Sequence, residues 1–304
     1  MAADDAVPTL SVVVVSFNSP ALLDSCLASL IPQAAEHAAE VLIVRAGSRD
    51  RSELRQLRNR FPSALWLTAP DGETIPRLRV RGLMSARGTI VGLLEDDCTI
   101  DPRWCTAVLT AHREPCVAIG GAVEPGAYRR GIDWAVYFYE YGRFMLPFRP
   151  HHSSVLPGNN VTYKRADVIA ALTTAPEGFF DVFVHEAWDR AGQRLQITPS
   201  IVVTNVNSWP ASHVTSAPFH HGRGFAAQRV KGRRLRDRVA MAAVTPLLPA
   251  VQIFRITRDT MRRKRLRGRL FSSVPWLALF ATSWAAGECV GYLCGAGRSL
   301  DRWR

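Results

Sequence analysis

The sequence predicts an α/β fold with a mostly parallel central sheet and helices on both faces, followed by a C-terminal region of apolar and basic helices. Apolar segments alternate with helix-like segments through residues 10–119, which is typical of parallel strands joined by helical crossovers. Residues 223–304 hold eighteen Lys and Arg against four Asp and Glu, so the formal net charge of +12 is concentrated there. We therefore expect one globular domain over residues 1–230 and a basic helical region over residues 231–304.

The predicted strands are short runs of β-branched and leucine residues. Residues 10–16 (LSVVVVS) and 89–94 (TIVGLL) are almost entirely apolar, as expected for strands covered on both faces of a sheet. Residues 40–44, 64–67 and 117–119 are shorter runs of the same kind. These five segments supply the strands of the predicted sheet.

The segments between these strands have helical spacing. Ser19 can cap a helix that begins at Pro20, because proline is favoured at the first helical position. The predicted helices cover residues 20–30, 51–60, 76–86 and 101–112. Residues 132–148 are rich in aromatic side chains, and we expect a helix and loop that pack in the core. The alternative is an apolar wall of a binding site.

The overall composition sets limits on the class of protein. The chain has 304 residues, and 47% of them are hydrophobic, which excludes a disordered chain or a polytopic transporter. Six cysteines show neither a CxxC pair nor zinc-ligand spacing, so we expect reduced, mostly buried thiols. The first residues are acidic and lack a basic segment, so we expect no cleavable signal peptide.

The basic C-terminal region favours an anionic membrane surface over nucleic acid as its partner. Two apolar stretches, residues 239–256 and 272–297, flank a run rich in arginine, and few aromatic side chains interleave with the charges. Pro246 and Pro249 interrupt the first stretch, which we expect to lie in the membrane plane or to re-enter it. The second is long enough to span a bilayer of about 30 Å or forms a second interfacial helix. The alternative is two soluble helices packed on the domain.

Three acids, Glu95, Asp96 and Asp97, directly follow the apolar run 89–94. The carboxyl end of a parallel strand borders the crevice in which open α/β sheets bind ligands. Clustered carboxylates repel one another, and a hard divalent ion such as Mg²⁺ or Mn²⁺ would relieve that repulsion and also bind a diphosphate. The acids therefore indicate a metal site, the alternative being a solvated acidic turn.

The order of these segments resembles family-two inverting glycosyltransferases, which have the A-type nucleotide-sugar fold. The resemblance covers about residues 10–225 and rests on the order and spacing of several motifs, none of which is specific alone. These are Ser16-Phe17-Asn18 after the first strand, Gly47-Ser48-Arg49-Asp50 after the second, Arg79-x-x-Gly82-x-x-x-Ala86-x-Gly88, the three acids, and Pro102-x-Trp104. It implies that residues 1–230 form the catalytic domain.

The resemblance also implies a role for each matching position. Ser16 and Asn18 would lie against the nucleoside, and Arg79 would pair with the nucleotide. Asp97 would bind the metal, with Glu95 as a further ligand or near the ribose, and Asp96 belongs to the same nucleotide site. The segment of Gly158, Asn159 and Asn160 would line the donor sugar, because amides offer both donors and acceptors to hydroxyl groups.

Two further sites follow from the resemblance. The family places an acidic pair about a dozen residues before a glycine. Counting back from Gly192 reaches Phe180-Asp181, so Asp181 takes the second place of that pair and would be the general base that deprotonates the acceptor hydroxyl, with Glu186 as the competitor. The segment His220-His221-Gly222-Arg223 would close over the diphosphate. There Arg223 would contact phosphate, and His221 would be an additional metal ligand.

The expected protein is a metal-dependent inverting glycosyltransferase at the cell membrane, with its catalytic domain on the cytoplasmic side. It would add single sugars from a nucleotide diphosphate sugar to a lipid-linked or glycan acceptor of the cell envelope, use Mg²⁺ or Mn²⁺, and contact an anionic membrane surface through residues 239–297. No nucleic-acid partner is expected. Two alternatives stay open. One is a sugar nucleotidyltransferase, and the other is a catalytically silent membrane scaffold, which is favoured by Arg45 standing where the family has a base-reading aspartate.

Overall fold

The computed structural model describes residues 7–47, 52–173 and 178–302, so the predicted loop residues 48–50 and Arg51 lie outside the described part. The chain divides into two compact units. The first is Met1–Gly126 with Phe144–Val206, and the second is Ala127–Arg143 with Asn207–Arg304. The second unit therefore takes in the aromatic segment and residues 207–230 besides the predicted region 231–304. Where the catalytic part of the chain ends stays a prediction.

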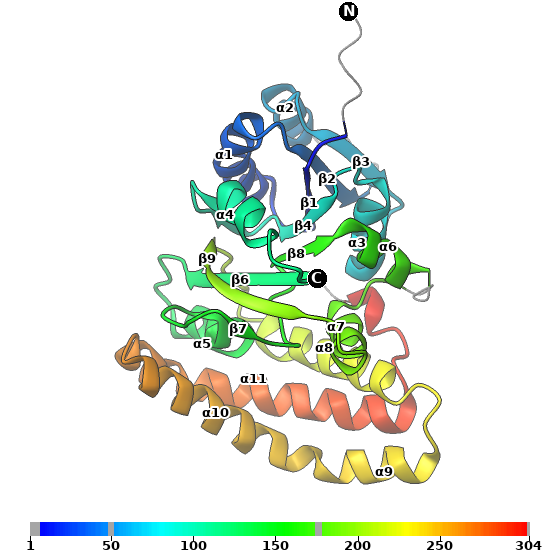
Figure 1. The fold of residues 1–304 in the computed structure, drawn as a ribbon. Coiled ribbons are helices and arrows are strands. Elements are labelled where there is room, and N and C mark those ends of the chain that lie inside the picture. Colours follow the sequence, from blue (N-terminus) through cyan, green and yellow to red (C-terminus); the bar gives the residue numbers. More distant parts are fainter. Residues whose placement is uncertain (1–6, 48–51, 174–177, 303–304) are drawn as a thin grey trace, which may run out of the picture. The chain divides into compact units, whose positions relative to one another are not determined.

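In the described part of the first unit, nine strands form one sheet (Figure 1). Their order is β3-β2-β1-β4-β8-β6-β9-β5, and β7 pairs with β9. The strands are β1 Leu10–Ser16, β2 Glu40–Ala46, β3 Leu65–Ala69, β4 Ile90–Glu95, β5 Cys98–Ile100, β6 Ala118–Pro125, β7 His151–His152, β8 Asn160–Lys164 and β9 Leu195–Asn205. All five predicted strands are confirmed to within a few residues.

The sheet is mixed, which corrects the prediction of a mostly parallel one. β3, β2, β1 and β4 are parallel neighbours, and β6 is parallel to β9. β8 runs antiparallel to both β4 and β6, and β5 and β7 run antiparallel to β9. The sequence did not reveal β5 and β8 because both are short and carry polar residues, so neither shows an apolar run.

Helices cover both faces of this sheet, as predicted. A Cβ at Gly82 of α3 would lie 2.3 Å from a methyl group of Val13, whereas a Cβ at Gly92 would lie 2.7 Å from the indole of Trp104 in α4. Val12 is the register partner of Gly92, so Val13 points to the opposite face. The helices of this unit are α1 Pro20–Glu36, α2 Ser52–Arg60, α3 Ile75–Ser85, α4 Trp104–Ala111, α6 Arg165–Leu172 and α7 Asp181–Arg190.

The described part of the second unit is helical, with α11 packed along α8, α5, α10 and α9 (Figure 1). Glycines allow α8 and α11 to touch: a Cβ at Gly287 would lie 2.1 Å from the carbonyl oxygen of Phe219, and one at Gly291 would lie 2.4 Å from that of Arg223. The helices are α5 Gly131–Glu140, α8 His213–Arg229, α9 Leu235–Val244, α10 Leu248–Arg263 and α11 Arg267–Cys294, and the short 3₁₀ turns are η1 Gly142–Phe144, η2 Thr245–Leu247 and η3 Leu300–Arg302.

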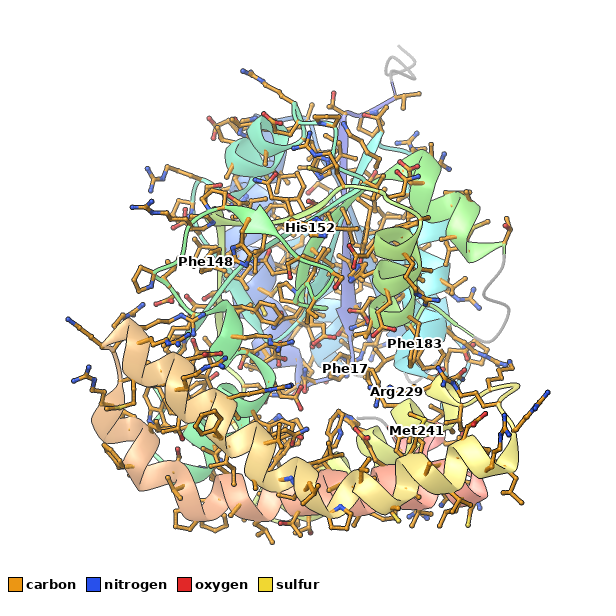
Figure 2. The ribbon with its side chains drawn as sticks, turned by 60° about the horizontal axis from the view of Figure 1, so that its bottom comes forward. Phe17, Phe148, His152, Phe183, Arg229 and Met241 are labelled. Carbon is orange, nitrogen blue, oxygen red and sulfur yellow. The ribbon has the colours of Figure 1, made fainter. Side chains whose placement is uncertain are left out.

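A buried acid joins these helices. Glu288 of α11 accepts hydrogen bonds from the Trp284 indole (2.7 Å) and the Tyr292 hydroxyl (2.8 Å). Arg229 of α8, labelled in Figure 2, lies 3.4 Å from Glu288 and donates to the Tyr292 hydroxyl.

The predicted core role of the aromatic segment, residues 132–148, is confirmed, since Trp134 and Tyr137 of α5 are buried.

Two helical stretches of the described chain are long and apolar enough to cross a membrane, judged by length and composition. They are Leu235–Arg263, which comprises α9, η2 and α10, and Arg267–Cys294, which is α11. Of the most apolar 18 residues, 11% are buried inside the protein in the first stretch and 44% in α11. Membrane association is therefore only weakly suggested by these helices, and α11 serves as a core helix of its unit.

Candidate active site at the carboxyl end of β4

Asp96 shapes the loop that follows β1. Its carboxylate accepts hydrogen bonds from the Ser16 hydroxyl (2.7 Å), the Asn18 side chain (2.8 Å) and the backbone N–H groups of Phe17 and Asn18 (both 3.1 Å). Arg45 donates to the Ser16 hydroxyl and to the Asn18 carbonyl oxygen, and it lies 3.7 Å from Asp96. Asp96 and Arg45 thus fix the loop from two sides. A contact of Ser16, Asn18 or Asp96 with a nucleoside stays a prediction.

Arg79 joins three parts of the site. One nitrogen of its guanidinium donates to Asp181 at the start of α7 (2.9 Å), and the other donates to Glu95 at the end of β4 (2.9 Å) and approaches the Gly158 carbonyl oxygen (3.5 Å). Burial disfavours the charged guanidinium, yet Asp181 and Glu95 raise the pKa of Arg79 above its ordinary value. Gly158 allows this approach, because a Cβ there would lie 2.7 Å from Asp181 and 2.9 Å from Arg79.

Asp97 is buried beside a thiol and an amide. The Cys98 thiol lies 3.5 Å from one Asp97 oxygen, and the Asn159 side-chain N–H donates to the sulfur of Cys98 (3.4 Å). Burial and the charges of Glu95 and Asp96 raise the pKa of Asp97 to about 7. The side-chain oxygen of Asn159 is buried and makes no hydrogen bond. A buried acceptor without a donor is costly, so this oxygen is suited to bind a ligand.

These side chains fit a divalent cation that is held largely by its substrate. Four carboxylates, Glu95, Asp96, Asp97 and Asp181, gather around two guanidiniums, so the cluster carries two more negative charges than positive ones when all are ionised. Among the described residues, no cation lies within ion-pair distance of Asp97, and no three His, Cys, Asp or Glu side chains form a metal cage. A Mg²⁺ or Mn²⁺ site of one or two carboxylates completed by phosphate and water oxygens needs no such cage.

Glu95 and Asn160 are engaged within the protein. Glu95 pairs with Arg79, as described, and burial raises its pKa. The side chain of Asn160 accepts from the Trp104 indole (2.9 Å) and donates to the carbonyl oxygens of Ala122 (2.9 Å) and Ile201 (3.1 Å). It therefore links α4 to β6 and β9. Roles of Glu95 at the metal and of Asn160 at the sugar stay predictions.

The two candidate bases on α7 differ in environment. Asp181 is buried against Arg79, whereas Glu186 is exposed, because five residues of helix turn its side chain to another face. Behind Asp181, the Tyr163 hydroxyl hydrogen-bonds His185 (3.0 Å). Burial lowers the pKa of His185 to about 4, so this buried pair is neutral. Of the two candidate bases, Asp181 is therefore the one that belongs to the polar cluster.

His221 and Arg223 belong to the second unit. His221 lies edge-on to the rings of Trp209 and Trp284, and burial together with His220 lowers its pKa to about 4. Arg223 donates to the Gly295 carbonyl oxygen (2.8 Å), and its guanidinium lies against Gly297. Both side chains are thus held by their own unit. Their predicted metal and phosphate contacts stay predictions.

Four side chains in or beside the candidate site escaped the sequence analysis. Arg45 appeared there only as a departure from the family pattern, although a guanidinium two strands away from a cluster of acids is a natural partner for them. Cys98 follows the acids directly and was counted among the reduced, mostly buried thiols. Nothing in the sequence indicated the pairing of Tyr163 with His185, because it depends on the antiparallel strand β8.

The fold and the cluster define an α/β protein with a candidate ligand site at the carboxyl end of its parallel strands, where open α/β sheets bind their ligands. The family model described as glycosyl transferase family 2 matches residues 11–169. This is more than half of the 304 residues, and the chain belongs to that family.

Similar proteins agree with this assignment. The chain is 28% identical over 107 residues to a putative glycosyltransferase, EpsH, of Bacillus subtilis, and 31% identical over 97 residues to a hyaluronan synthase of Pasteurella multocida. These stretches cover 34% and 31% of this chain, but only 30% and 10% of the two relatives. The activities of those whole proteins therefore do not carry over directly.

A solved structure shares the fold. It is the mannosyltransferase PcManGT from Pyrobaculum calidifontis in complex with GDP-Man and Mn²⁺, with a TM-score of 0.52 and 16% identity over 92% of this chain and 74% of that one. At such low identity the likeness concerns the fold alone. The predicted A-type nucleotide-sugar fold is thereby confirmed.

Proposed function

We propose that this protein is a metal-dependent inverting glycosyltransferase that moves one sugar from a nucleotide diphosphate sugar to a lipid-linked or other membrane-proximal acceptor. The observation that carries the proposal is the surplus of buried carboxylates at the end of β4, in a chain of glycosyl transferase family 2. Buried charge without compensation is costly, so such a surplus favours a bound cation.

The carboxylate of Asp97 and the side-chain oxygen of Asn159 are the groups best suited to hold Mg²⁺ or Mn²⁺. When bound, the ion would bind the diphosphate and offset the charge that develops on the departing nucleoside diphosphate. The loop fixed by Asp96 and Arg45 would receive the nucleoside. Its geometry is set before the donor arrives, which reduces the ordering that binding requires.

Asp181 is the proposed general base. It would accept the proton of the acceptor hydroxyl while that oxygen attacks the anomeric carbon and the bond to the diphosphate breaks. Arg79 holds the carboxylate in place beside Gly158 through a hydrogen bond of 2.9 Å. Glu186 lacks such a setting, because it is exposed on α7.

The acceptor and the location of the enzyme form the next part of the proposal. Nucleotide sugars are found in the cytosol, so the donor site would face it. The arginine-rich helices of the second unit favour the cytoplasmic surface of the cell membrane, where anionic lipids attract such segments. A membrane-held acceptor would then make the product a cell-envelope glycan.

The test uses the full-length protein and a panel of nucleotide sugars with Mn²⁺. We expect free nucleoside diphosphate from at least one donor, and at least a hundredfold less from Asp97→Asn and from Asp181→Asn. Glu186→Gln, which changes an exposed carboxylate on the same helix as Asp181, is the matched control and should retain activity. Release in the Asp97→Asn variant at the wild-type rate would refute the metal assignment. No release by the wild-type protein from any donor would favour a catalytically silent scaffold.

A further inference from the structure

One face of α9 and α10 is a continuous apolar surface. It consists of exposed residues that recur at helical spacing, and we call it the α9–α10 stripe: Val239, Ala240, Ala243, Val244, Leu247, Ala250, Val251 and Phe254. Leu247 and Phe254 are 65% and 66% exposed. No charged residue occurs between Arg238 and Arg255. A stripe of this length is unusual on a surface that faces water.

The opposite face of the same helices is anchored in the second unit. Ala242 packs with Val230 and Tyr292, and Met241, labelled in Figure 2, lies against this cluster. Gln252 accepts a hydrogen bond from the Tyr139 hydroxyl of α5. The two polar side chains of residues 239–254, Thr245 and Gln252, are thus both bonded within the unit. Rotation that would bury the stripe would break these contacts.

Arginines continue the stripe at both ends. Arg236 precedes Val239 by three residues, while Arg258 and Arg262 follow Phe254 at four and eight residues, which places them on the same helical face. All three are exposed. An apolar centre between basic ends matches an anionic bilayer surface, where acyl chains lie beside phosphate groups.

The length of the stripe favours a position in the membrane plane. Its 16 residues extend about 24 Å, less than the roughly 30 Å of a bilayer core. The 3₁₀ turn at Pro246 also interrupts the α-helix in the middle of the stripe. α11 is a poor candidate for a lone span, because Gly287, Gly291 and Glu288 are committed to α8.

We propose that the α9–α10 stripe docks this protein on an anionic phospholipid surface as an in-plane helix, with its side chains among the upper acyl chains and its arginines at the phosphates. α11 stays within the protein and does not cross the bilayer. Docking requires neither the donor nor the metal, so it stands apart from the proposed glycosyl transfer.

The test measures binding of the full-length protein to vesicles of phosphatidylcholine alone or mixed with phosphatidylglycerol. We expect binding to the mixed vesicles and much weaker binding to phosphatidylcholine. The double variant Leu247→Glu/Phe254→Glu should lower the partition coefficient at least tenfold, because two large side chains would no longer be buried among the acyl chains. Met84→Glu is the matched control, because Met84 is 53% exposed on α3, and it should bind like the wild type. An unchanged thermal midpoint confirms that each variant is folded.

Charge and depth are tested separately. Each of Arg258→Gln and Arg262→Gln should weaken binding to the anionic vesicles about fivefold, whereas Arg103→Gln, an 89% exposed arginine of the first unit, should not. Alkaline carbonate should release the bound protein, since an in-plane helix holds no transmembrane segment. Resistance to carbonate would overturn the proposal in favour of a span. If the Leu247→Glu/Phe254→Glu variant bound the anionic vesicles as strongly as the wild type, the proposal would also be wrong. The same holds if the wild type does not bind vesicles but forms a dimer in solution and the double variant is monomeric.

Discussion

Replacing Arg79 by methionine should destabilise the first unit strongly. The guanidinium lies 2.9 Å from both Glu95 and Asp181, and its side chain is only 11% exposed. Methionine retains much of the apolar bulk but leaves two buried carboxylates without their cation. Breaking a buried pair by removing one partner costs about 3–5 kcal/mol, and we expect a loss in that range from urea unfolding at neutral pH.

Arg77→Met is the matched control on the same helix. Arg77 is 60% exposed and lies 3.6 Å from Glu73, so its loss should cost less than about 1 kcal/mol. In the double variant Arg79→Met/Glu95→Gln only Asp181 remains uncompensated, and stability should partly return. Equal unfolding midpoints for Arg79→Met and Arg77→Met would show that the reasoning about the buried bridge is wrong.

A further variant, Arg79→Lys, separates two roles of Arg79 in activity. If the guanidinium holds Asp181 in place, a folded Arg79→Lys variant should lose kcat by roughly a hundredfold, with little change in the KM for the donor, because a small displacement of a catalytic group is costly. If Arg79 instead binds the donor phosphate, as the family resemblance implies, the KM for the donor should rise. Steady-state kinetics with one active donor distinguishes the two outcomes.

Two further predictions concern stability. Burial lowers the pKa of His112 to about 3, below the value of about 6.5 in an unfolded chain. The unfolded state therefore binds more protons, and the free energy of unfolding falls as the pH drops below 6.5. The variant His112→Gln should lose about 2.5 kcal/mol less stability than the wild type between pH 7 and pH 4.5, and identical pH profiles would contradict this. Gly287→Ala should destabilise the second unit by more than about 1 kcal/mol, since its Cβ would lie 2.1 Å from a backbone oxygen of α8, whereas Gly268→Ala, with open space around it, should stabilise α11 by about 0.5–1 kcal/mol in thermal unfolding.

The parallel half of the sheet could be predicted from the sequence because its signals are local. β1 and β4 are almost wholly apolar, and the acids after β4 mark the end of that strand without reference to any other segment. The antiparallel half depends on pairing between distant segments. β5 is three residues long and pairs with β9 about a hundred residues later, a contact that no local pattern encodes.

The acidic cluster shows the same division. That Glu95, Asp96 and Asp97 lie together at a strand end follows from their position in the sequence. How their charges are shared does not, because neighbouring side chains alternate in direction along a strand and its turn. Asp96 turns to the loop after β1 and to Arg45, Glu95 turns to Arg79, and Asp97 is left beside Cys98. Only the fold separates three adjacent acids into three different environments.

The role of Arg45 bears on whether the site is active. As a departure from the family pattern it suggested a degenerate site and hence a silent scaffold. In the structure its guanidinium bonds Ser16 and Asn18 and lies 3.7 Å from the buried Asp96, so it completes the loop instead of disrupting it. Buried ion pairs can often be replaced by apolar side chains at little or no loss of stability, so the fold alone does not require these charges. The cluster, with its surplus of carboxylates, therefore favours a working site, and Arg45 supports the loop that follows β1.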